Sequence, residues 1–304
     1  MRILVTGSSG FIGRYLVETL RKKKHTIIEF SRDEGDDITS SESVAKKMKN
    51  VEVVIHLAAE LDEAKGWEKL HAVNVQGTHN VLEAAEKAKV EQFIFISSVG
   101  VYGHTVQRRD ETSELEPETL YEKSKLEAEK AVQEFQEVFP VTVIRPALVL
   151  GPTPYWAQVF KLVRKGFPLI GKGKNAWQMV YVKDLVEFIL HCVGNEDAFN
   201  ETFVCAEKEA HTLREIINMV AEIQGKKHVR SVPASIGTIA SYFFLAHGKI
   251  TGKKPLLSPA HVKRLSKHRE YSIEKAEKLG WKPAYSTKAA LEETYSELQK
   301  NKMI

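Results

Sequence analysis

Residues 7–13 read Gly-Ser-Ser-Gly-Phe-Ile-Gly and decide the fold, because they join a short apolar run at 3–5 to a helical pattern at 11–24. A glycine-rich turn between a strand and a helix lets the backbone approach a phosphate, and the amino end of the helix then holds the anion. The same glycines would also suit an ordinary tight turn. Because a strand precedes them and a helix follows, the sequence favours a nucleotide-binding turn.

Strand patterns and helical patterns alternate through the first half of the chain. Apolar strands that alternate with helices predict a parallel sheet covered on both faces, that is, a doubly wound α/β fold of Rossmann type. The strands are predicted at 2–6, 25–31, 51–57, 91–97 and 141–146, and the helices at 11–24, 40–49, 67–89 and 119–138.

The regular alternation of strand and helical patterns ends after Gly151-Pro152, where the segments become shorter and prolines become more frequent. We predict a dinucleotide-binding Rossmann domain over 1–150 and a smaller α+β substrate-binding region over 151–304. The stretch at 177–206 is expected to return to the sheet. Ligands in such folds bind outside the carboxyl ends of the strands, so the second region should cover the site.

Composition limits the classes of protein that the chain could be. It has 304 residues, 43% hydrophobic and 28% charged, and a net charge of only +4, which gives no argument for nucleic acid as a partner. Cys192 and Cys205 lie in apolar segments and are expected as buried thiols, not as a disulfide or metal site. The sequence shows no signal peptide and no membrane-spanning run, so we expect a cytoplasmic protein without membrane contact.

Four polar residues are candidates for chemistry. Tyr121 and Lys125 stand four apart in a helical pattern, so the ammonium would lower the pKa of the phenol and suit it to proton transfer with an alcohol. Ser98 closes a predicted strand at the edge where ligands bind. Asn74 stands inside a helical pattern although asparagine forms helices poorly. A surface Tyr–Lys pair, a capping hydroxyl and a solvated amide are the ordinary alternatives.

Together these residues resemble the extended short-chain dehydrogenase/reductase superfamily, and in particular its NAD-dependent epimerase/dehydratase family. The resemblance covers most of the chain, and its motifs occur in register. They are Thr6-Gly7-xx-Gly10-xx-Gly13, His56-Leu57-Ala58-Ala59, Asn74, Ser98-Val99-Gly100-Val101-Tyr102-Gly103, Tyr121-xxx-Lys125, Arg145-Pro146 and Val182-x-Asp184-Leu185.

The resemblance implies an NAD(P)-dependent oxidoreductase that transfers a hydride between the nicotinamide and a secondary alcohol or ketone. Tyr121 would be the general acid/base, and Lys125 would bind the nicotinamide ribose and assist Tyr121. Ser98 would hydrogen-bond the reacting oxygen, and Asn74 would support the proton relay. The cofactor-binding residues that it implies are Gly7, Ser9, Gly10, Phe11, Ile12, Gly13, Ser31, Arg32, Asp37, Ile38, Leu57, Ala58, Ala59, Tyr121, Lys125 and Pro146.

The end of the second predicted strand bears on the choice of cofactor. NAD-binding relatives place an acidic residue there to hold the ribose hydroxyls, whereas this chain has Ser31 and Arg32. A guanidinium would pair with the 2′-phosphate of NADP, so we expect NADP in preference to NAD. If the register of the predicted second strand were shifted, Asp33 or Glu29 would lie at the ribose, which would weaken this prediction.

Two departures from the family pattern reduce the number of activities that we expect for this chain. Dehydratases carry Asp-Glu after the catalytic hydroxyl residue, but this chain has Val99-Gly100, which argues against elimination of water. Sugar-nucleotide epimerases commonly place an asparagine where this chain has Leu148. The sequence is therefore more similar to the 3β-hydroxysteroid dehydrogenase and dihydroflavonol reductase branch.

Other interpretations stay open. A nucleotide-sugar 4-epimerase is the enzymatic alternative, and a dinucleotide-sensing protein without catalysis is the other. The apolar run at 236–245 could line a hydrophobic pocket, or could be a core or dimer helix. Members of the family often pair through a four-helix contact, which implies a homodimer that uses the helix of Tyr121.

Overall fold

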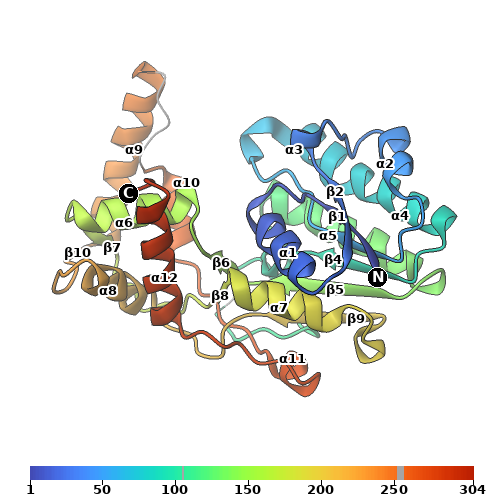
Figure 1. Cartoon of the computed structure of the whole chain (residues 1–304). Helices are drawn as coiled ribbons and strands as arrows, with labels where there is room; N and C mark the ends of the chain where they lie inside the picture. The colour runs from blue at the N-terminus through green and yellow to red at the C-terminus, as the bar shows by residue number, and fades with distance from the viewer. Residues whose placement is uncertain (105, 252–256) are drawn as a thin grey trace.

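The computed structural model describes residues 1–104, 106–251 and 257–304. A six-stranded parallel sheet in the order β2-β1-β3-β4-β5-β9 forms the larger body, with helices on both faces (Figure 1). The predicted doubly wound α/β fold is therefore confirmed. The strands of this sheet are β1 (Arg2–Thr6), β2 (Thr26–Phe30), β3 (Val53–His56), β4 (Gln92–Ile96), β5 (Val141–Pro146) and β9 (Glu201–Cys205).

Helices and short strands account for most of the remaining chain. The helices are α1 (Phe11–Lys22), α2 (Ser41–Lys47), α3 (Gly66–His71), α4 (Gly77–Ala88), α5 (Leu120–Glu134), α6 (Pro154–Arg164), α7 (Val182–Cys192), α8 (Leu213–Ile223), α9 (Ala234–Thr251), α10 (Pro259–Leu265), α11 (Glu274–Lys278) and α12 (Thr287–Lys300). The short strands are β6 (Leu148–Leu150), β7 (Leu169–Ile170), β8 (Met179–Tyr181) and β10 (Ser231–Val232).

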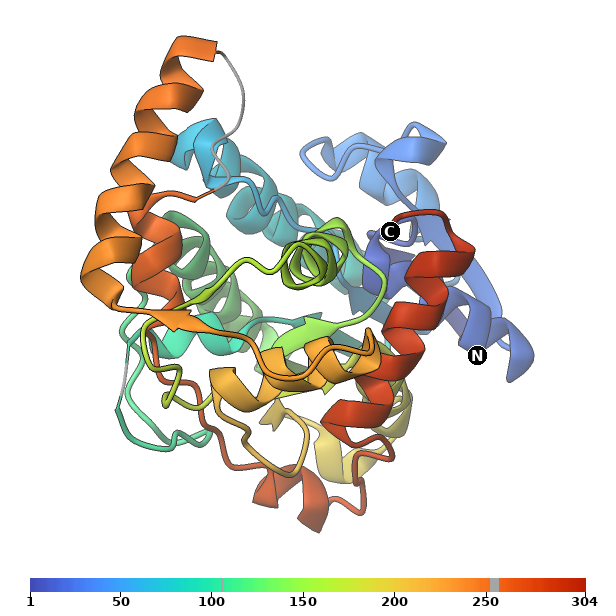
Figure 2. The same cartoon turned by 90° about the vertical axis from the view of Figure 1, so that its left-hand side faces the viewer.

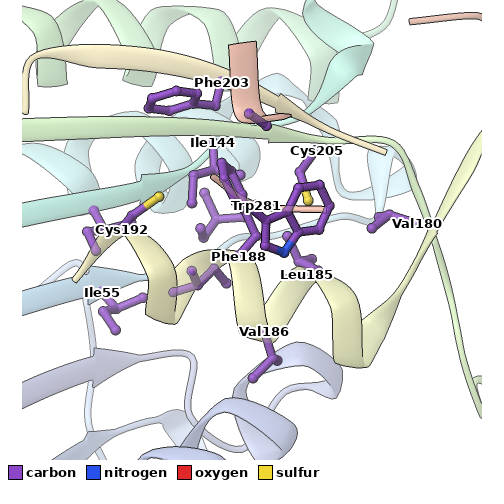
Figure 3. Close-up of a cluster of buried hydrophobic side chains, with 14 of the residues drawn as sticks. Ile55, Ile144, Val180, Leu185, Val186, Phe188, Cys192, Phe203, Cys205 and Trp281 are labelled. Carbon is purple, nitrogen blue, oxygen red and sulfur yellow. The ribbon is translucent and has the colours of Figure 1, made fainter. Parts of the chain in front are cut away.

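Successive residues of each central strand pack on opposite faces of the sheet. In β1, Ile3 and Val5 join the core beneath α1 and α7, whereas Leu4 joins the core beneath α2, α4 and α5. Figure 3 shows the first of these cores, where Phe188 of α7 meets Trp281 with ring centroids 4.8 Å apart. Because both faces are buried, the strands are continuous apolar runs, which is why the sequence predicted them well.

The order of the strands indicates the edge of the sheet at which a ligand would bind. β1 lies between β2 and β3, so the order of the strands reverses at the β1–β3 boundary. All six strands run in parallel, so their carboxyl ends meet at one edge of the sheet. Ligands of open α/β sheets bind outside this edge at the point of reversal.

The second half of the chain forms a smaller body beside the sheet (Figure 1). Its core gathers residues of α6, α8 and α12 around β6 and β8, which pair in parallel. β9 instead adds to the main sheet beside β5, and α7 covers one of its faces. No helix in the described ranges is long and apolar enough to cross a membrane.

Candidate active site

The glycine turn joins β1 to α1 in a conformation that depends on two of its glycines. Gly7 has φ 71°, in the left-handed region, and its N–H donates to the carbonyl of Phe30 at 2.8 Å. A Cβ at Gly13 would lie 2.2 Å from the carbonyl oxygen of Gly7 and 2.6 Å from that of Ser8. Backbone therefore packs directly on backbone, and only glycine fits at position 13.

The residues around this turn fit a dinucleotide. The buried hydroxyl oxygens of Ser8 and Ser31 have no hydrogen-bond partner among the residues that the structure describes. Gly10 caps α1 without a side chain, and the first turn of α1 contains no acidic residue. The free N–H groups of that turn can therefore receive a phosphate, and a hydroxyl at the end of β2 lies where a ribose is bound in such folds.

The loop after β3 lies directly against the glycine turn. The N–H groups of Leu57 and Ala58 donate to the carbonyl and to Oγ1 of Thr6, at 3.1 and 3.2 Å. A Cβ at Gly7 would lie only 2.8 Å from the nitrogen of Ala58. Of the other predicted cofactor residues, Ser9, Gly10 and Ala59 lie in these two loops, whereas Phe11 and Ile12 begin α1 and also pack against apolar core.

The structure places Ser31 and Arg32 immediately after β2, as the sequence register predicted. Arg32 is largely exposed, and its guanidinium lies 3.9 Å from the carboxylate of Glu60. Glu29 lies inside β2 and forms an ion pair with Arg21. A cation and a carboxylate are thus both present at this end of the site.

Asp37 and Ile38 follow a short distance along the chain. The carboxylate of Asp37 accepts hydrogen bonds from the side chain and N–H of Thr39, which lower its pKa. Ile38 is buried, and its carbonyl accepts from the side-chain amide of Asn80 at 3.0 Å. Ile38 therefore packs against α4.

Tyr121 and Lys125 occupy the first turns of α5, which a capping box of Thr119 and Glu122 begins. The ammonium of Lys125 lies 4.1 Å from the ring centroid of Phe95 in β4. Burial, with a contribution from Glu122, raises the pKa of Tyr121 to about 12. Burial also lowers the pKa of Lys125 to about 7. Desolvation is the largest cause of both shifts, and the expectation that Lys125 lowers the pKa of Tyr121 stays a prediction.

Ser98 follows β4 and caps the short 3-10 turn that packs against α5. Its Oγ accepts a hydrogen bond from the N–H of Gly100 at 3.0 Å, which is the capping role that the sequence left open. A Cβ at Gly100 would lie 2.8 Å from Cγ of Glu122 and 3.2 Å from Oγ of Ser98. The glycine therefore brings the Ser98 hydroxyl close to the turn of α5 that carries Tyr121.

Asn74 lies in a π-helical turn, Ala72–Gln76, between α3 and α4. Such a turn within a helix is frequent at functional sites. The Asn74 Oδ1 accepts from the N–H of Glu60 at 2.7 Å, and Nδ2 donates to Oγ of Ser124 at 2.8 Å. Ser124 Oγ in turn donates to the carbonyl of Tyr121 at 2.8 Å. The buried amide therefore ties the loop after β3 to the turn that carries Tyr121.

Sequence reasoning missed Ser124 as a member of this site. It stands three residues after Tyr121, a spacing at which a serine hydroxyl can bond back to a helical carbonyl. That spacing could have indicated the bond between Ser124 and the Tyr121 carbonyl. It could not have indicated that Asn74 donates a hydrogen bond to Ser124, because Asn74 is distant in the sequence.

His56 joins the glycine turn to the Asn74 turn through a buried chain of hydrogen bonds. Its Nδ1 lies 2.8 Å from Oγ1 of Thr6, and its Nε2 lies 3.0 Å from Oγ1 of Thr78. Thr78 donates its own proton to the carbonyl of Asn74, so these bonds assign the ring proton to Nε2. Burial, then the nearby Lys125, lowers the pKa of His56 to about 3, and the ring stays neutral.

A buried ion pair fixes the far side of α5 against the sheet. Arg145 of β5 pairs with Glu129 of α5 and donates to the hydroxyl of Tyr102 at 2.8 Å. Glu129 also accepts from the hydroxyl of Ser97 at 2.7 Å. Pro146, the last residue of β5, is thereby held at the same edge as the other candidate cofactor residues.

The burial of Lys125 predicts a pH-dependent stability. Its folded pKa of about 7 lies below the ordinary lysine value of 10.5, so between these pH values the unfolded chain binds more protons, and stability rises with pH. The destabilising effect is fully present below about pH 7. Lys125→Met is expected to raise Tm by at least about 2 °C at about pH 6, and by less at about pH 10. Thermal unfolding at both pH values measures this, with the exposed Lys130→Met as control; an equal shift at both would contradict it.

The second half of the chain supplies a cationic cluster near the start of α5. The guanidinium carbon of Arg269 lies 4.7 Å from the ring centroid of Trp177. Desolvation lowers the pKa of Arg269, and Arg264 lowers it further, so the two cations are close neighbours. Both also lower the pKa of Tyr155, which desolvation raises.

In the described part of the chain, neither Arg264 nor Arg269 has a carboxylate in a salt bridge, although Glu122 acts on Arg269 at longer range. Two adjacent cations without a bonded acid are a suitable site for an anion with more than one charge. No group of three or more His, Cys, Asp or Glu side chains among the described residues could hold a metal ion.

Comparison with known proteins agrees with this geometry. The model of the NAD dependent epimerase/dehydratase family matches residues 3–206. The chain is 30% identical to the N-acetyl-α-D-glucosaminyl-diphospho-ditrans,octacis-undecaprenol 4-epimerase of Escherichia coli O157:H7, over 96% of this chain and 93% of the relative. It is 29% identical to a 3-beta-hydroxysteroid dehydrogenase of Mycolicibacterium neoaurum, over 96% and 90% of the two chains.

Solved structures agree as well. The UDP-glucose 4-epimerase of Thermotoga maritima, crystallised with UDP-glucose, superposes with a TM-score of 0.80 at 25% identity and 99% coverage of both chains. The UDP-glucuronic acid 4-epimerase of Bacillus cereus, in complex with NAD, has the same TM-score, 22% identity and the same coverage, and so shows the fold. The chain is an enzyme of the extended short-chain dehydrogenase/reductase type and belongs to the NAD-dependent epimerase/dehydratase family.

Proposed function

We propose that this enzyme is an NAD-dependent 4-epimerase of a sugar carried on a diphosphate. The observation that carries the proposal is the pair of arginines, Arg264 and Arg269, because the charge of Arg264 lowers the pKa of Arg269 and Glu122 of α5 acts on the same guanidinium. A diphosphate would pair with both arginines, whereas an uncharged steroid alcohol offers neither of them an opposite charge. The Escherichia coli relative is named for a sugar on diphospho-undecaprenol, which agrees with this substrate class.

In the proposed mechanism, this chain moves the proton and holds the substrate. With a pKa of about 12, Tyr121 is protonated at neutral pH and becomes a base only when positive charge beside it stabilises the phenolate. Lys125 supplies that charge in its protonated form. Ser98 would donate its hydroxyl proton to the reacting oxygen, and NAD supplies the reversible acceptance of a hydride when bound.

The second candidate function is the dehydrogenase of a secondary alcohol, which the sequence favoured first. Leu148 cannot donate a side-chain hydrogen bond to a nucleotide diphosphate, and a 3-beta-hydroxysteroid dehydrogenase is similar over nearly the whole chain. Leu148 removes one hydrogen bond to a diphosphate, whereas the arginine pair would supply two charged partners for it, and the Escherichia coli relative is named for a lipid-linked diphosphate. We therefore rank the epimerase first.

Product analysis separates the two functions. The enzyme is incubated with NAD and N-acetylglucosamine linked either to UDP or to a short polyprenyl diphosphate, and the configuration at C4 is read by NMR. An epimerase inverts C4 without net change in nicotinamide absorbance, because the hydride returns within one binding event. A net absorbance change with a 3β-hydroxysteroid, and no inversion of either sugar, would overturn the proposal in favour of the dehydrogenase.

The arginine pair yields a quantitative prediction. Arg269→Ala should raise KM for the diphosphate-linked sugar by about tenfold or more and leave kcat within a few-fold, because a charge-assisted hydrogen bond contributes about 1.5–3 kcal/mol. Initial rates measure it, with Arg21→Ala as a control far from the site. An unchanged KM would remove Arg269 from substrate binding.

The finer expectations from sequence stay predictions. The family and the NAD-bound neighbour give no support for a preference for NADP, and the homodimer, the cytoplasmic location and the absence of a nucleic-acid partner are likewise untested. The division into domains at residue 150 also stays a prediction.

A further inference from the structure

α9 presents an apolar surface to solvent. The exposed fractions of Ile236, Ile239, Tyr242 and Phe243 are 53%, 59%, 58% and 73%. From 234 to 246 the sequence contains no charged residue, so this surface lacks the lysines and glutamates usual on an exposed helix. In Figures 1 and 2, α9 rises beyond the neighbouring helices, which leaves the surface open. Much of the apolar run at 236–245 therefore faces outward, which argues against a place in the core of the chain.

The opposite face of α9 attaches it to the protein. Ser241 is buried, and a Cβ at Gly237 would lie 2.3 Å from a methyl carbon of Ile170 in β7. α10 packs alongside, and Thr238 of α9 and Val262 of α10 line a common pocket. Because Gly237 and Ser241 fix the inner face, Ile236, Ile239 and Phe243 point away by the helical period.

The segment that carries α9 is strongly basic. Residues 223–269 contain ten lysines and arginines and no aspartate or glutamate. The rest of the chain has 34 basic against 40 acidic residues and is net acidic, so the positive charge of the protein is concentrated here. Among the described residues, Lys172, Lys174, Lys263 and Arg264 lie exposed near the base of α9.

We propose that α9 and its basic surroundings bind the surface of an anionic lipid bilayer, with the apolar face inserted at the headgroup level. Apolar side chains flanked by lysine and arginine are what such a surface binds. A second copy placed face to face on α9 would bring two acid-free basic segments together, and their repulsion opposes that arrangement. Nucleic acid would leave the apolar side chains exposed. This proposal departs from the sequence-based expectation of a protein without membrane contact, and it involves contact with one leaflet only.

The surface lies next to the candidate active site. Lys263 of α10 and the following Lys267 pair with Glu118 at 3.3 and 3.4 Å, and Glu118 stands three residues before Tyr121. A bilayer bound at α9 would therefore lie near the entrance from which a lipid-linked sugar diphosphate could enter. The membrane contact itself does not rest on the proposed function, since it follows from the apolar face and the charge.

Vesicle co-sedimentation tests the proposal. The full chain is mixed with vesicles of phosphatidylcholine alone, or with about 30% phosphatidylglycerol, at about 0.15 M salt. We expect binding to the anionic vesicles only, weakened by added salt, and a loss of about tenfold or more in the partition coefficient for Phe243→Glu. Val138→Glu is the matched control, because Val138 is also an exposed apolar residue, 50% accessible, and lies just beyond α5.

A second measurement keeps the test independent of folding defects. Phe243→Trp retains an aromatic residue, and brominated lipids should quench its fluorescence if the side chain enters the bilayer. Failure of the wild type to sediment with anionic vesicles, or equal binding by Phe243→Glu and Val138→Glu, would overturn the proposal. A dimer in sedimentation velocity that Phe243→Glu abolishes, without vesicle binding by the wild type, would assign the surface to a second copy instead. Vesicle binding needs no substrate. The membrane proposal can therefore fail while epimerase activity is found, and epimerase activity can be absent while the protein binds vesicles.

Discussion

Tyr121→Phe is expected to lower kcat by at least about a thousandfold while NAD still binds. The substitution removes only the phenolic hydroxyl, which is the proton donor and acceptor in the proposed reaction. The fold should tolerate it, because the hydrogen bonds that hold Tyr121 in α5 use its backbone: its N–H donates to Glu63 at 3.0 Å, and its carbonyl accepts from Ser124. Steady-state rates and a separate titration of NAD measure the two effects.

The control for this variant is Tyr295→Phe, which also removes a phenolic hydroxyl group. Tyr295 packs against Phe160 in the smaller body, with ring centroids 5.0 Å apart, and should leave kcat unchanged. A Tyr121→Phe enzyme with wild-type kcat would exclude Tyr121 as the acid/base. A variant that loses NAD binding together with turnover would show that Tyr121 holds the cofactor more than it moves a proton.

Gly13→Val should weaken NAD binding by about a hundredfold or more and destabilise the protein by about 1–3 kcal/mol. The first added carbon would lie 2.2 Å from a backbone oxygen of Gly7, and neither backbone can turn aside as a flexible side chain could. α1 must therefore move away from the loop, which displaces the N–H groups expected to hold the phosphates. Calorimetric titration and thermal unfolding measure the two losses.

Gly166→Ala is the matched glycine control. Gly166 has φ 77°, and no atom of the described residues lies within 4 Å of an added Cβ, so alanine there brings only backbone strain of about 1 kcal/mol. Its affinity for NAD should equal that of the wild type. Normal NAD binding by Gly13→Val would mean that the turn is not the phosphate site.

The sequence predicted the sheet because its strands are buried on both faces. Ile3, Leu4 and Val5 are all fully buried, so the strand is apolar at every position and is visible without alternation. The glycine turn was equally visible, because close backbone approach at Gly13 admits no other residue. The long helix predicted at 67–89 is present, but the π turn at Asn74 within it was not predicted, because one shifted hydrogen-bond pattern barely changes the helical period.

By itself, then, the sequence determined the doubly wound fold, the glycine turn and the identity of the residues available for proton transfer, since each depends on local spacing or close backbone contact. Only the tertiary structure decided how desolvation shifts the pKa values of Tyr121 and Lys125, because desolvation depends on neighbours such as Phe95 that are distant in the chain. It also decided that Arg264 and Glu122 of α5 both act on Arg269, and that the apolar face of α9 points outward. An apolar helical pattern is the same whether packing covers it or leaves it exposed.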